Sequence, residues 1–206
     1  MDNFFSIKKI EIESDKKDFI GIQELKKSNL IFVSEKEVKE IIIKKNPSVD
    51  KVEIEKKYPG TLVLKINIEK PIVNLITSQG YFHLSSQGEI LSKSKTLDNK
   101  IPIINYYQKL NFQSYQAGDF LSFKDIKSTL YLIKEVNNLN IDIDNVDING
   151  VNMILFKIGD KKIIFSSEKD TELQLYQLQQ IVRQFKVEGK QFKEIDLRFD
   201  KPVVRY

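Results

Sequence analysis

Apolar and charged residues alternate along several segments of this chain, most clearly near its C-terminus. In Ile195–Asp200 every second residue is apolar and the others are charged, a pattern typical of a strand with one buried and one exposed face. Pro202 has no backbone donor and predicts a turn or sheet margin before a second short strand over Val203–Tyr206. If the edge of this sheet is open, it can accept another polypeptide; if it is covered, these are ordinary sheet strands. The pattern leaves both interpretations open.

Residues 1–71 predict a small α+β domain. Alternation predicts three strands, and helical spacing predicts two helices between the first and second strands. The strands are Phe4–Ser14, Val49–Lys57 and Thr61–Glu69, and the helices are a short one within Phe19–Leu30 and one that follows Ser34. Two helices can cover one face of a three-stranded sheet, as a two-layer domain requires.

Local signals place the ends of these elements. Ser34 and Glu37 have the spacing of a capping box at the start of the second helix. Asn46-Pro47 predicts its end. Tyr58-Pro59-Gly60 predicts the turn between the second and third strands.

Residues 72–206 predict a larger, strand-rich mixed domain with two helices. Ser122 and Asp125 are spaced as a second capping box, before a helix that ends near Leu139. The second helix spans Asp170–Glu188, and Gly189 predicts its end. Before the closing strands, apolar segments predict strands over Ile72–Thr77, Tyr81–Leu84, Glu89–Leu91, Ile101–Asn105, Val146–Ile148, Val151–Ile158 and Lys161–Ser166, with Ser92–Lys100 and Tyr106–Gly118 as loops.

One turn of this domain has a specific prediction. Asn149-Gly150 separates two strands, and this dipeptide favours a type I′ turn with both residues at positive φ. Gly159-Asp160 predicts a second tight turn.

Composition narrows the classes of function. The sequence is 41% hydrophobic and 30% charged, as in globular proteins. It has no cysteine, which excludes disulfides and thiolate metal sites. The net charge of +4 comes from lysines mixed with glutamates and few arginines, so we expect no nucleic-acid binding. No segment approaches the roughly 20 apolar residues of a membrane span.

Candidate catalytic chemistry is sparse. His83 is the single histidine and lies in a predicted strand, where a packing or surface role is the default. The aspartates at 142, 144 and 147 do not have the spacing of a calcium-binding loop. The glycines are isolated, without a phosphate-binding pattern. We expect neither enzymatic activity nor a cofactor or metal.

The chain resembles the FtsQ/DivIB family of bacterial cell-division proteins. The segment NPSVDKVEIEKKYPGTLVLKINIEKPIV is similar to the POTRA domain of that family, with Tyr58, Pro59 and Leu62 at matching positions. Lys56-Lys57 replaces its usual arginine. GYFHLSSQGEIL, GDKKIIFSS and EGKQFKEIDLRFDKPVVRY are similar to the family's β domain, and IDLRF is the most specific motif. The resemblance implies a POTRA domain over 1–71 and a β domain over 72–206.

The resemblance also implies a function. Members are non-enzymatic scaffolds that bind FtsL-like and FtsB-like (DivIC-like) proteins and regulate septal peptidoglycan synthesis. They contact other division proteins through the POTRA domain. Arg198 and Phe199 match the arginine and aromatic of the family's partner-binding strand, and the implied binding residues are Asp196, Leu197, Arg198, Phe199, Val203, Val204 and Arg205.

The parity of Phe199 with Ile195 and Leu197 leaves it equally open that Phe199 is a core residue. Members carry a membrane-spanning helix before the POTRA domain. We therefore expect the chain to be the extracytoplasmic part of a single-pass membrane protein at the division septum.

Two other classes stay open. One is a POTRA-containing module of an outer-membrane assembly or secretion system, which tandem repeats or a barrel-forming segment would favour. The other is a cell-wall hydrolase that depends on His83.

Overall fold

The computed structural model describes residues 3–26, 28–150 and 152–206 of the 206-residue chain. Within these residues the chain has four α-helices and forms a three-stranded and a nine-stranded sheet, both mixed. The fold class is therefore α+β, as predicted. The chain divides into two compact units, one that ends at Lys70 and one that spans Pro71–Tyr206. The boundary expected from the sequence lies between residues 71 and 72.

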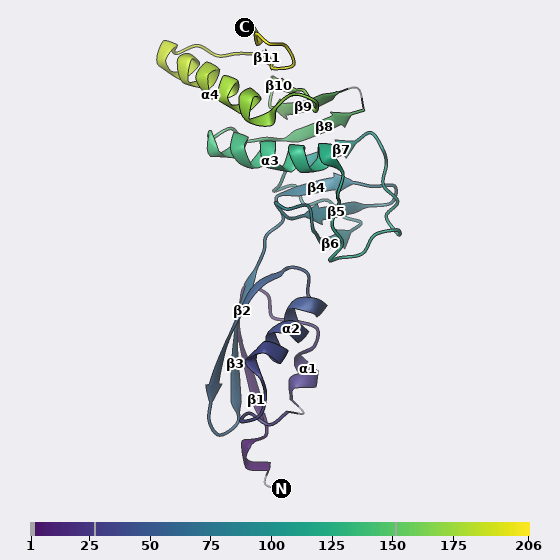
Figure 1. Ribbon diagram of the computed structural model, residues 1–206, viewed down its shortest axis with the longest axis vertical. Helices are drawn as coiled ribbons and strands as arrows, with labels where there is room; N and C mark the ends of the chain where they lie inside the picture. Colours follow the sequence, from purple (N-terminus) through teal and green to yellow (C-terminus); the bar gives the residue numbers. More distant parts are fainter. Residues whose placement is uncertain (1–2, 27, 151) are drawn as a thin grey trace. The chain divides into compact units, whose positions relative to one another are not determined.

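The first unit packs two helices on one face of the three-stranded sheet (Figure 1). Its sheet has the order β1-β3-β2, with β1 parallel and β2 antiparallel to β3. Apolar side chains from the helices and from one face of the sheet form a single core. In chain order the elements are η1 (Asn3–Phe5), β1 (Lys9–Glu13), α1 (Ile22–Leu25), α2 (Glu35–Lys45), β2 (Val49–Lys57) and β3 (Thr61–Ile68).

The second unit packs α3 (Lys124–Asn138) and α4 (Thr171–Glu188) on one face of the nine-stranded sheet (Figure 1). The strand order is β12-β11-β10-β9-β8-β7-β4-β5-β6. The strands are β4 (Val73–Ile76), β5 (Tyr81–Leu84), β6 (Ile90–Ser94), β7 (Ile103–Tyr106), β8 (Asn145–Asn149), β9 (Met153–Ile158), β10 (Lys161–Phe165), β11 (Glu194–Asp196) and β12 (Val203–Arg205).

Each helix of this unit connects two parallel strands. β7 and β8 pair in parallel through α3, and β10 and β11 do so through α4. Such crossovers place a helix over the sheet, where it buries the apolar face of the strands. The alternation in the strands therefore puts Ile195 and Leu197 into the same core as Leu175 and Leu178 of α4.

The short helix predicted within Phe19–Leu30 is present. α1 covers Ile22–Leu25, and the residues after it pair with the N-terminal segment. The amide of Ile7 donates to the carbonyl of Ser28 (3.1 Å), and the amide of Leu30 donates to the carbonyl of Phe5 (2.8 Å). These tertiary hydrogen bonds hold the residues after α1 against the N-terminal segment.

Neither predicted capping box forms. Ser34 is the N-cap residue of α2, but its side chain makes no capping hydrogen bond. The N-cap of α3 is Phe123 and not Ser122. The carboxylate of Asp125 instead accepts from the hydroxyl of Tyr106 at 3.3 Å. Packing of the apolar faces sets both helix starts.

The turn at Asn149-Gly150 also differs from the prediction. Asn149 pairs with Met153, so the connection is longer than the two residues of a type I′ turn. Positive φ occurs at Asn152 (52°) and at neither residue of the Asn149-Gly150 pair. The remaining predicted strand residue, Val151, lies outside the described residues. Elsewhere, β6 continues to Ser94 in a segment predicted as loop.

Candidate partner-binding edge

The two outer strands of the nine-stranded sheet differ in how their edges are occupied. At β6, the amide of Gly118 donates to the carbonyl of Ile90 (2.8 Å), and the amide of Ile90 donates to the carbonyl of Asp119 (2.9 Å). At the other end, β12 pairs with β11 and, within the described residues, with no other strand. Every second residue of an antiparallel edge strand directs its N–H and C=O away from its neighbour. β12 is therefore the more open edge.

β11 ends at Asp196 because of a local turn. The Oδ1 atom of Asp196 accepts a hydrogen bond from the backbone amide of Arg198 at 3.1 Å, the bond that defines an Asx turn. The amide of Leu197 still donates to the carbonyl of Ile164 at 2.8 Å. The prediction of one continuous strand through Phe199 is therefore wrong, because the amide of Arg198 donates to the side chain of Asp196 and not to a neighbouring strand.

The guanidinium of Arg198 folds back onto the same carboxylate. Its Nε lies 3.0 Å and 3.3 Å from Oδ1 and Oδ2 of Asp196, and its Nη2 lies 2.7 Å from Oδ2. The side chain of Asp196 is 8% exposed and that of Arg198 is 37% exposed. Burial alone would raise the pKa of Asp196, but the hydrogen bonds and charge of Arg198 outweigh it and lower that pKa. The same hydrogen bonds raise the pKa of Arg198.

The residues between β11 and β12 are also attached to α4 and the segment before it. Nζ of Lys169 donates to the carbonyl of Phe199 at 2.8 Å and lies 3.4 Å from the carboxylate of Asp200. Nε2 of Gln177 donates to the carbonyl of Asp200 at 3.1 Å. The turn is therefore held in one conformation, which lowers the entropy cost of binding a partner there.

A buried glutamine fixes the start of α4. Gln174 is fully buried; its Oε1 accepts from the amide of Ser166 (2.7 Å), and its Nε2 donates to the carbonyl of Ser166 (3.0 Å). Neither Gln174 nor Lys169 was predicted from the sequence. The signal for Gln174 was its spacing, because it comes four residues before Leu178 and therefore lies on the apolar face of α4.

The binding residues expected from the sequence divide into two groups. Asp196 and Leu197 are buried, and Val204 is partly buried against the core. Four others are exposed: Arg198, Phe199, Val203 and Arg205. Phe199 is 54% exposed, so the alternative that it is a core residue is wrong. The turn at Asp196 breaks the alternation on which that alternative rested.

On the face of the sheet that the helices do not cover, a short strip of side chains, apolar except for Asp196, leads from this edge toward β9. In the strand register, Leu155 lies beside Ile164, and Ile164 lies beside Asp196, which pairs with Val203. Nη1 of Arg198 lies 3.7 Å from the Sδ atom of Met153. Arg198 therefore joins the edge to this strip, and a strand added beside β12 would place side chains next to it.

The chain matches no protein-family model and no curated protein.

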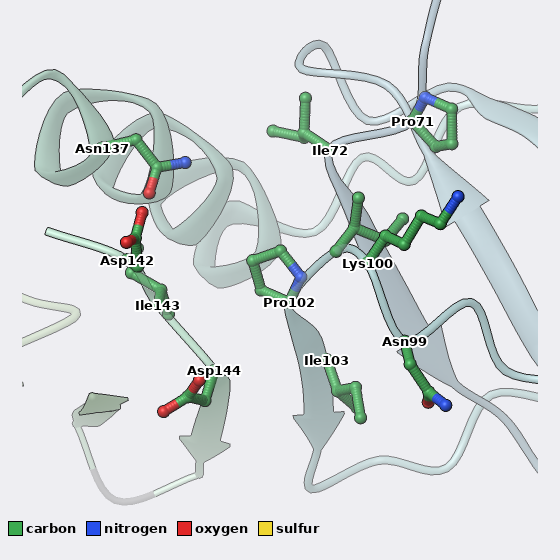
Figure 2. A pocket seen from close by; sticks show the side chains of 11 residues that line it. Pro71, Ile72, Asn99, Lys100, Pro102, Ile103, Asn137, Asp142, Ile143 and Asp144 are labelled. Atoms are coloured by element: carbon green, nitrogen blue, oxygen red, sulfur yellow. The ribbon is translucent and has the colours of Figure 1, made fainter. Parts of the chain in front are cut away.

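A pocket at the start of the second unit is a separate candidate, with a volume of about 680 Å³. Figure 2 shows Asp142 and Asp144 on one side and Asn99 and Lys100 on the other. The Oδ2 atom of Asp144 accepts from the amide of Gly159 at 2.6 Å, so this carboxylate stabilises the β9–β10 turn. The pocket lining has no serine, threonine or histidine, and we assign no reaction to it.

His83 has a structural partner. Nδ1 of His83 lies 2.7 Å from Oδ1 of Asn74, whose Nδ2 donates to the carbonyl of Asp98 at 2.7 Å. Because Asn74 presents its acceptor to the ring, Nδ1 carries the proton. Burial lowers the pKa of His83 despite the opposing charge of Asp98. The histidine is therefore neutral near pH 7 and links neighbouring strands.

Clusters of metal ligands and membrane-spanning helices are both absent from the described part of the chain. In that part, no group of three or more His, Asp or Glu side chains is placed to hold a metal ion. Asp147 instead pairs with Nζ of Lys157 at 2.7 Å. Across the same residues, the helices are too short or too polar for any of them to cross a membrane.

Proposed function

We propose that this chain is a non-enzymatic scaffold of the bacterial division machinery that binds FtsL-like and FtsB-like (DivIC-like) partners by β-strand addition. The observation that carries the proposal is the open edge of β12, in contrast to the occupied edge of β6. The resemblance of IDLRF and the flanking segments to FtsQ/DivIB proteins supplies the class of partner. Through these partners the scaffold regulates septal peptidoglycan synthesis from the extracytoplasmic side of the membrane.

Strand addition accounts for both affinity and specificity at this edge. Main-chain hydrogen bonds to Val203–Arg205 supply affinity that does not depend on the partner's sequence. Exposed side chains supply specificity: Phe199 offers an aromatic surface, and Arg198 lies with its guanidinium 5.8 Å from the Phe199 ring. Aromatic and arginine side chains are enriched among residues that dominate binding energies.

The first unit is proposed as a POTRA domain on the strength of its topology and of the YPGTL segment. A three-stranded sheet with two helices on one face agrees with that assignment. In this proposal the unit contacts other division proteins.

The test compares two phenylalanines of closely similar exposure at opposite ends of the same sheet. Phe199 is 54% exposed beside β12, and Phe120 is 57% exposed beside β6. We expect Phe199→Ala to weaken binding of an FtsB-like or DivIC-like partner at least tenfold, the effect of a residue with a large share of the binding energy. Phe120→Ala should leave it unchanged. Binding is measured by titration calorimetry with the soluble partner, with the FtsL-like chain present and absent.

Hydrogen exchange locates the bound segment. Partner-dependent protection in residues 195–206 supports strand addition at β12. Protection confined to residues 3–69 overturns this site and moves the interaction to the first unit. Absence of binding to either partner overturns the division function and leaves the assembly-module class.

A further inference from the structure

Three segments of the first unit meet at one end of it and expose large apolar side chains. They comprise residues 3–8, 28–34 and 56–61. The exposed fractions are 58% for Phe4, 45% for Ile31, 83% for Phe32 and 61% for Tyr58. We call these four side chains, with Lys8, Lys56 and Lys57 around them, the aromatic tip. Figure 1 shows this end of the unit at the N-terminus, beside the turn between β2 and β3.

Hydrogen bonds and ring contacts hold the aromatic tip together. The amide of Leu30 donates to the carbonyl of Phe5, and the amide of Lys8 donates to the carbonyl of Gly60, both at 2.8 Å. The rings of Phe4 and Phe5 are 5.1 Å apart, and those of Phe5 and Tyr58 are 6.2 Å apart. The exposed side chains therefore belong to one ordered surface that is not explained by core packing.

The charged residues within the three segments are all positive, although Glu35 directly follows one segment and Glu55 directly precedes another. The three segments contain Lys8, Lys56 and Lys57 and no Asp or Glu. Nζ of Lys8 lies 5.9 Å from the centre of the Phe4 ring, and Nζ of Lys56 donates to the carbonyl of Val33 at 2.8 Å. Lys57 lies 3.7 Å from Glu11 on the neighbouring sheet face. Elsewhere on the unit lysines and glutamates alternate, as in the pair Lys51–Glu53 at 2.7 Å.

Phenylalanine, tyrosine and isoleucine beside lysines match the chemistry of a membrane interface. Aromatic rings partition into the boundary between headgroups and acyl chains, and lysines are attracted to anionic headgroups. The core of a protein–protein interface is also apolar and aromatic, so the lysines are what favour an anionic lipid surface. The exposed atoms at this tip are mostly apolar, with ammonium groups at the rim.

We propose that the aromatic tip binds an anionic lipid surface. Phe4 and Phe32 enter the interfacial region, and Lys8 faces the lipid phosphates. This proposal stands independently of the proposed division function, because it uses a different unit and a different class of ligand.

The experiment measures sedimentation of the full chain with vesicles. Vesicles of phosphatidylglycerol and phosphatidylcholine are compared with vesicles of phosphatidylcholine alone. We expect binding to the anionic vesicles that weakens as salt is raised, because screening acts on exposed charges. Phe4→Ser/Phe32→Ser should reduce the partition coefficient roughly tenfold or more, since it removes two apolar side chains from the interface.

Matched controls separate the tip from general surface hydrophobicity and charge. Tyr176 and Val187 of α4 are 60% and 83% exposed, so Tyr176→Ser/Val187→Ser removes comparable exposed apolar surface and should leave partition unchanged. Lys8→Glu should weaken binding more than fivefold, since each lysine at an anionic surface contributes roughly that factor. Lys127→Glu makes the same charge change on α3 and should have a much smaller effect.

The outcomes decide the proposal in either direction. Loss of anionic-vesicle binding in the tip variants, with both controls unaffected and unchanged circular dichroism, supports it. Three results overturn it: no binding to anionic vesicles, equal losses in tip and control variants, or concentration-dependent self-association that the tip variant abolishes without any vesicle binding. In that last case the surface is an interface between copies of this chain.

Discussion

Arg198→Ala gives the sharpest test of how the candidate edge is held. The substitution removes the guanidinium that is bidentate to Asp196, with Nη2 at 2.7 Å and Nε at 3.0 Å from the carboxylate. The backbone bond from the amide of residue 198 remains, so Asp196 keeps one of its donors. A nearly buried carboxylate then loses its charged partner.

The magnitude follows from the burial of the two groups. A hydrogen bond to a charged group contributes about 1.5–3 kcal/mol, and removing one partner of a buried ion pair costs more. Arg198 is 37% exposed, so solvent screening reduces its share. We expect a loss of about 2 kcal/mol in the free energy of opening around β11, which corresponds to roughly thirtyfold faster exchange of the protected amides.

Native-state hydrogen exchange measures this locally. The amide of Leu197, which donates to the carbonyl of Ile164 at 2.8 Å, is the reporter. Arg205→Ala is the control, because Arg205 lies 3.3 Å from Glu194 and its side chain is 70% exposed. An exposed pair contributes under about 1 kcal/mol, so the control should change exchange less than roughly fivefold. Equal effects of the two variants, or no effect of Arg198→Ala, would refute the reasoning.

The pH dependence of the effect of Arg198→Ala provides a second test of the ion pair. The folded pKa of Asp196 lies below its ordinary value of 3.8. A group with a lowered folded pKa contributes stability above the unfolded pKa and loses it as the pH falls through the folded pKa. The difference in the free energy of opening between Arg198→Ala and the unmodified chain should therefore be largest near pH 6. It should shrink as the pH falls below 3.8. A difference that stays constant through this range would show that the ion pair is not its source.

Two further predictions concern the side chains at the start of α4, with Gln179 of α4 and the N-cap residue of α2 as controls. Gln174→Ala should cost about 2–4 kcal/mol, because both bonds to the buried backbone of Ser166 are lost; exposed Gln179→Ala should cost less than about 0.5 kcal/mol. Asp170→Ala should cost about 1 kcal/mol, because the Asp170 side chain caps α4, whereas Ser34→Ala should change stability by a few tenths, roughly 0.3 kcal/mol, because Ser34 makes no capping bond. Urea denaturation measures all four variants, and equal costs within either pair would contradict the assigned contacts.

The predictions were most accurate for long periodic segments, because there the tertiary packing buries the same residues that the hydrophobic pattern marks as apolar. The strand Val49–Lys57 was predicted with its full bounds. The helix Asp170–Glu188 differs by one residue at its start, where Asp170 is the N-cap. Its end at Gly189 is also correct, and the positive φ of 64° there is the conformation that glycine favours.

The failures occurred where a side chain or a distant segment competes with the local pattern. Within Phe19–Leu30 the predicted short helix is present as Ile22–Leu25, but the sequence did not predict that the residues after it bond to the N-terminal segment. Asn149-Gly150 has the dipeptide of a two-residue turn, yet the register of β8 and β9 moves the positive φ to Asn152. Strand register depends on the whole sheet and not on the turn alone.

The candidate edge contains one stretch where the alternating pattern predicts the structure correctly and one where a side chain overrides it. IDLRF alternates as a strand should. Ile195 and Asp196 lie in β11, and the amide of Leu197 still donates to the carbonyl of Ile164. The carboxylate of Asp196 then accepts a hydrogen bond from the amide of Arg198. The resulting Asx turn ends the strand, so Phe199 faces solvent instead of the core. The motif therefore encodes a strand followed by a held turn, and alternation could not distinguish this from a longer strand.

This arrangement changes how the two matched residues should be interpreted in binding experiments. Arg198 is the charged partner of a nearly buried carboxylate, so its removal alters the edge itself and any loss of partner binding includes that structural cost. Phe199 interacts with Arg198 by its ring and with Lys169 through its carbonyl, which alanine retains. Phe199→Ala therefore removes side-chain surface while it leaves the turn in place. A loss of partner affinity in Phe199→Ala with unchanged exchange at Leu197 assigns the effect to recognition, whereas a loss confined to Arg198→Ala assigns it to the stability of the edge.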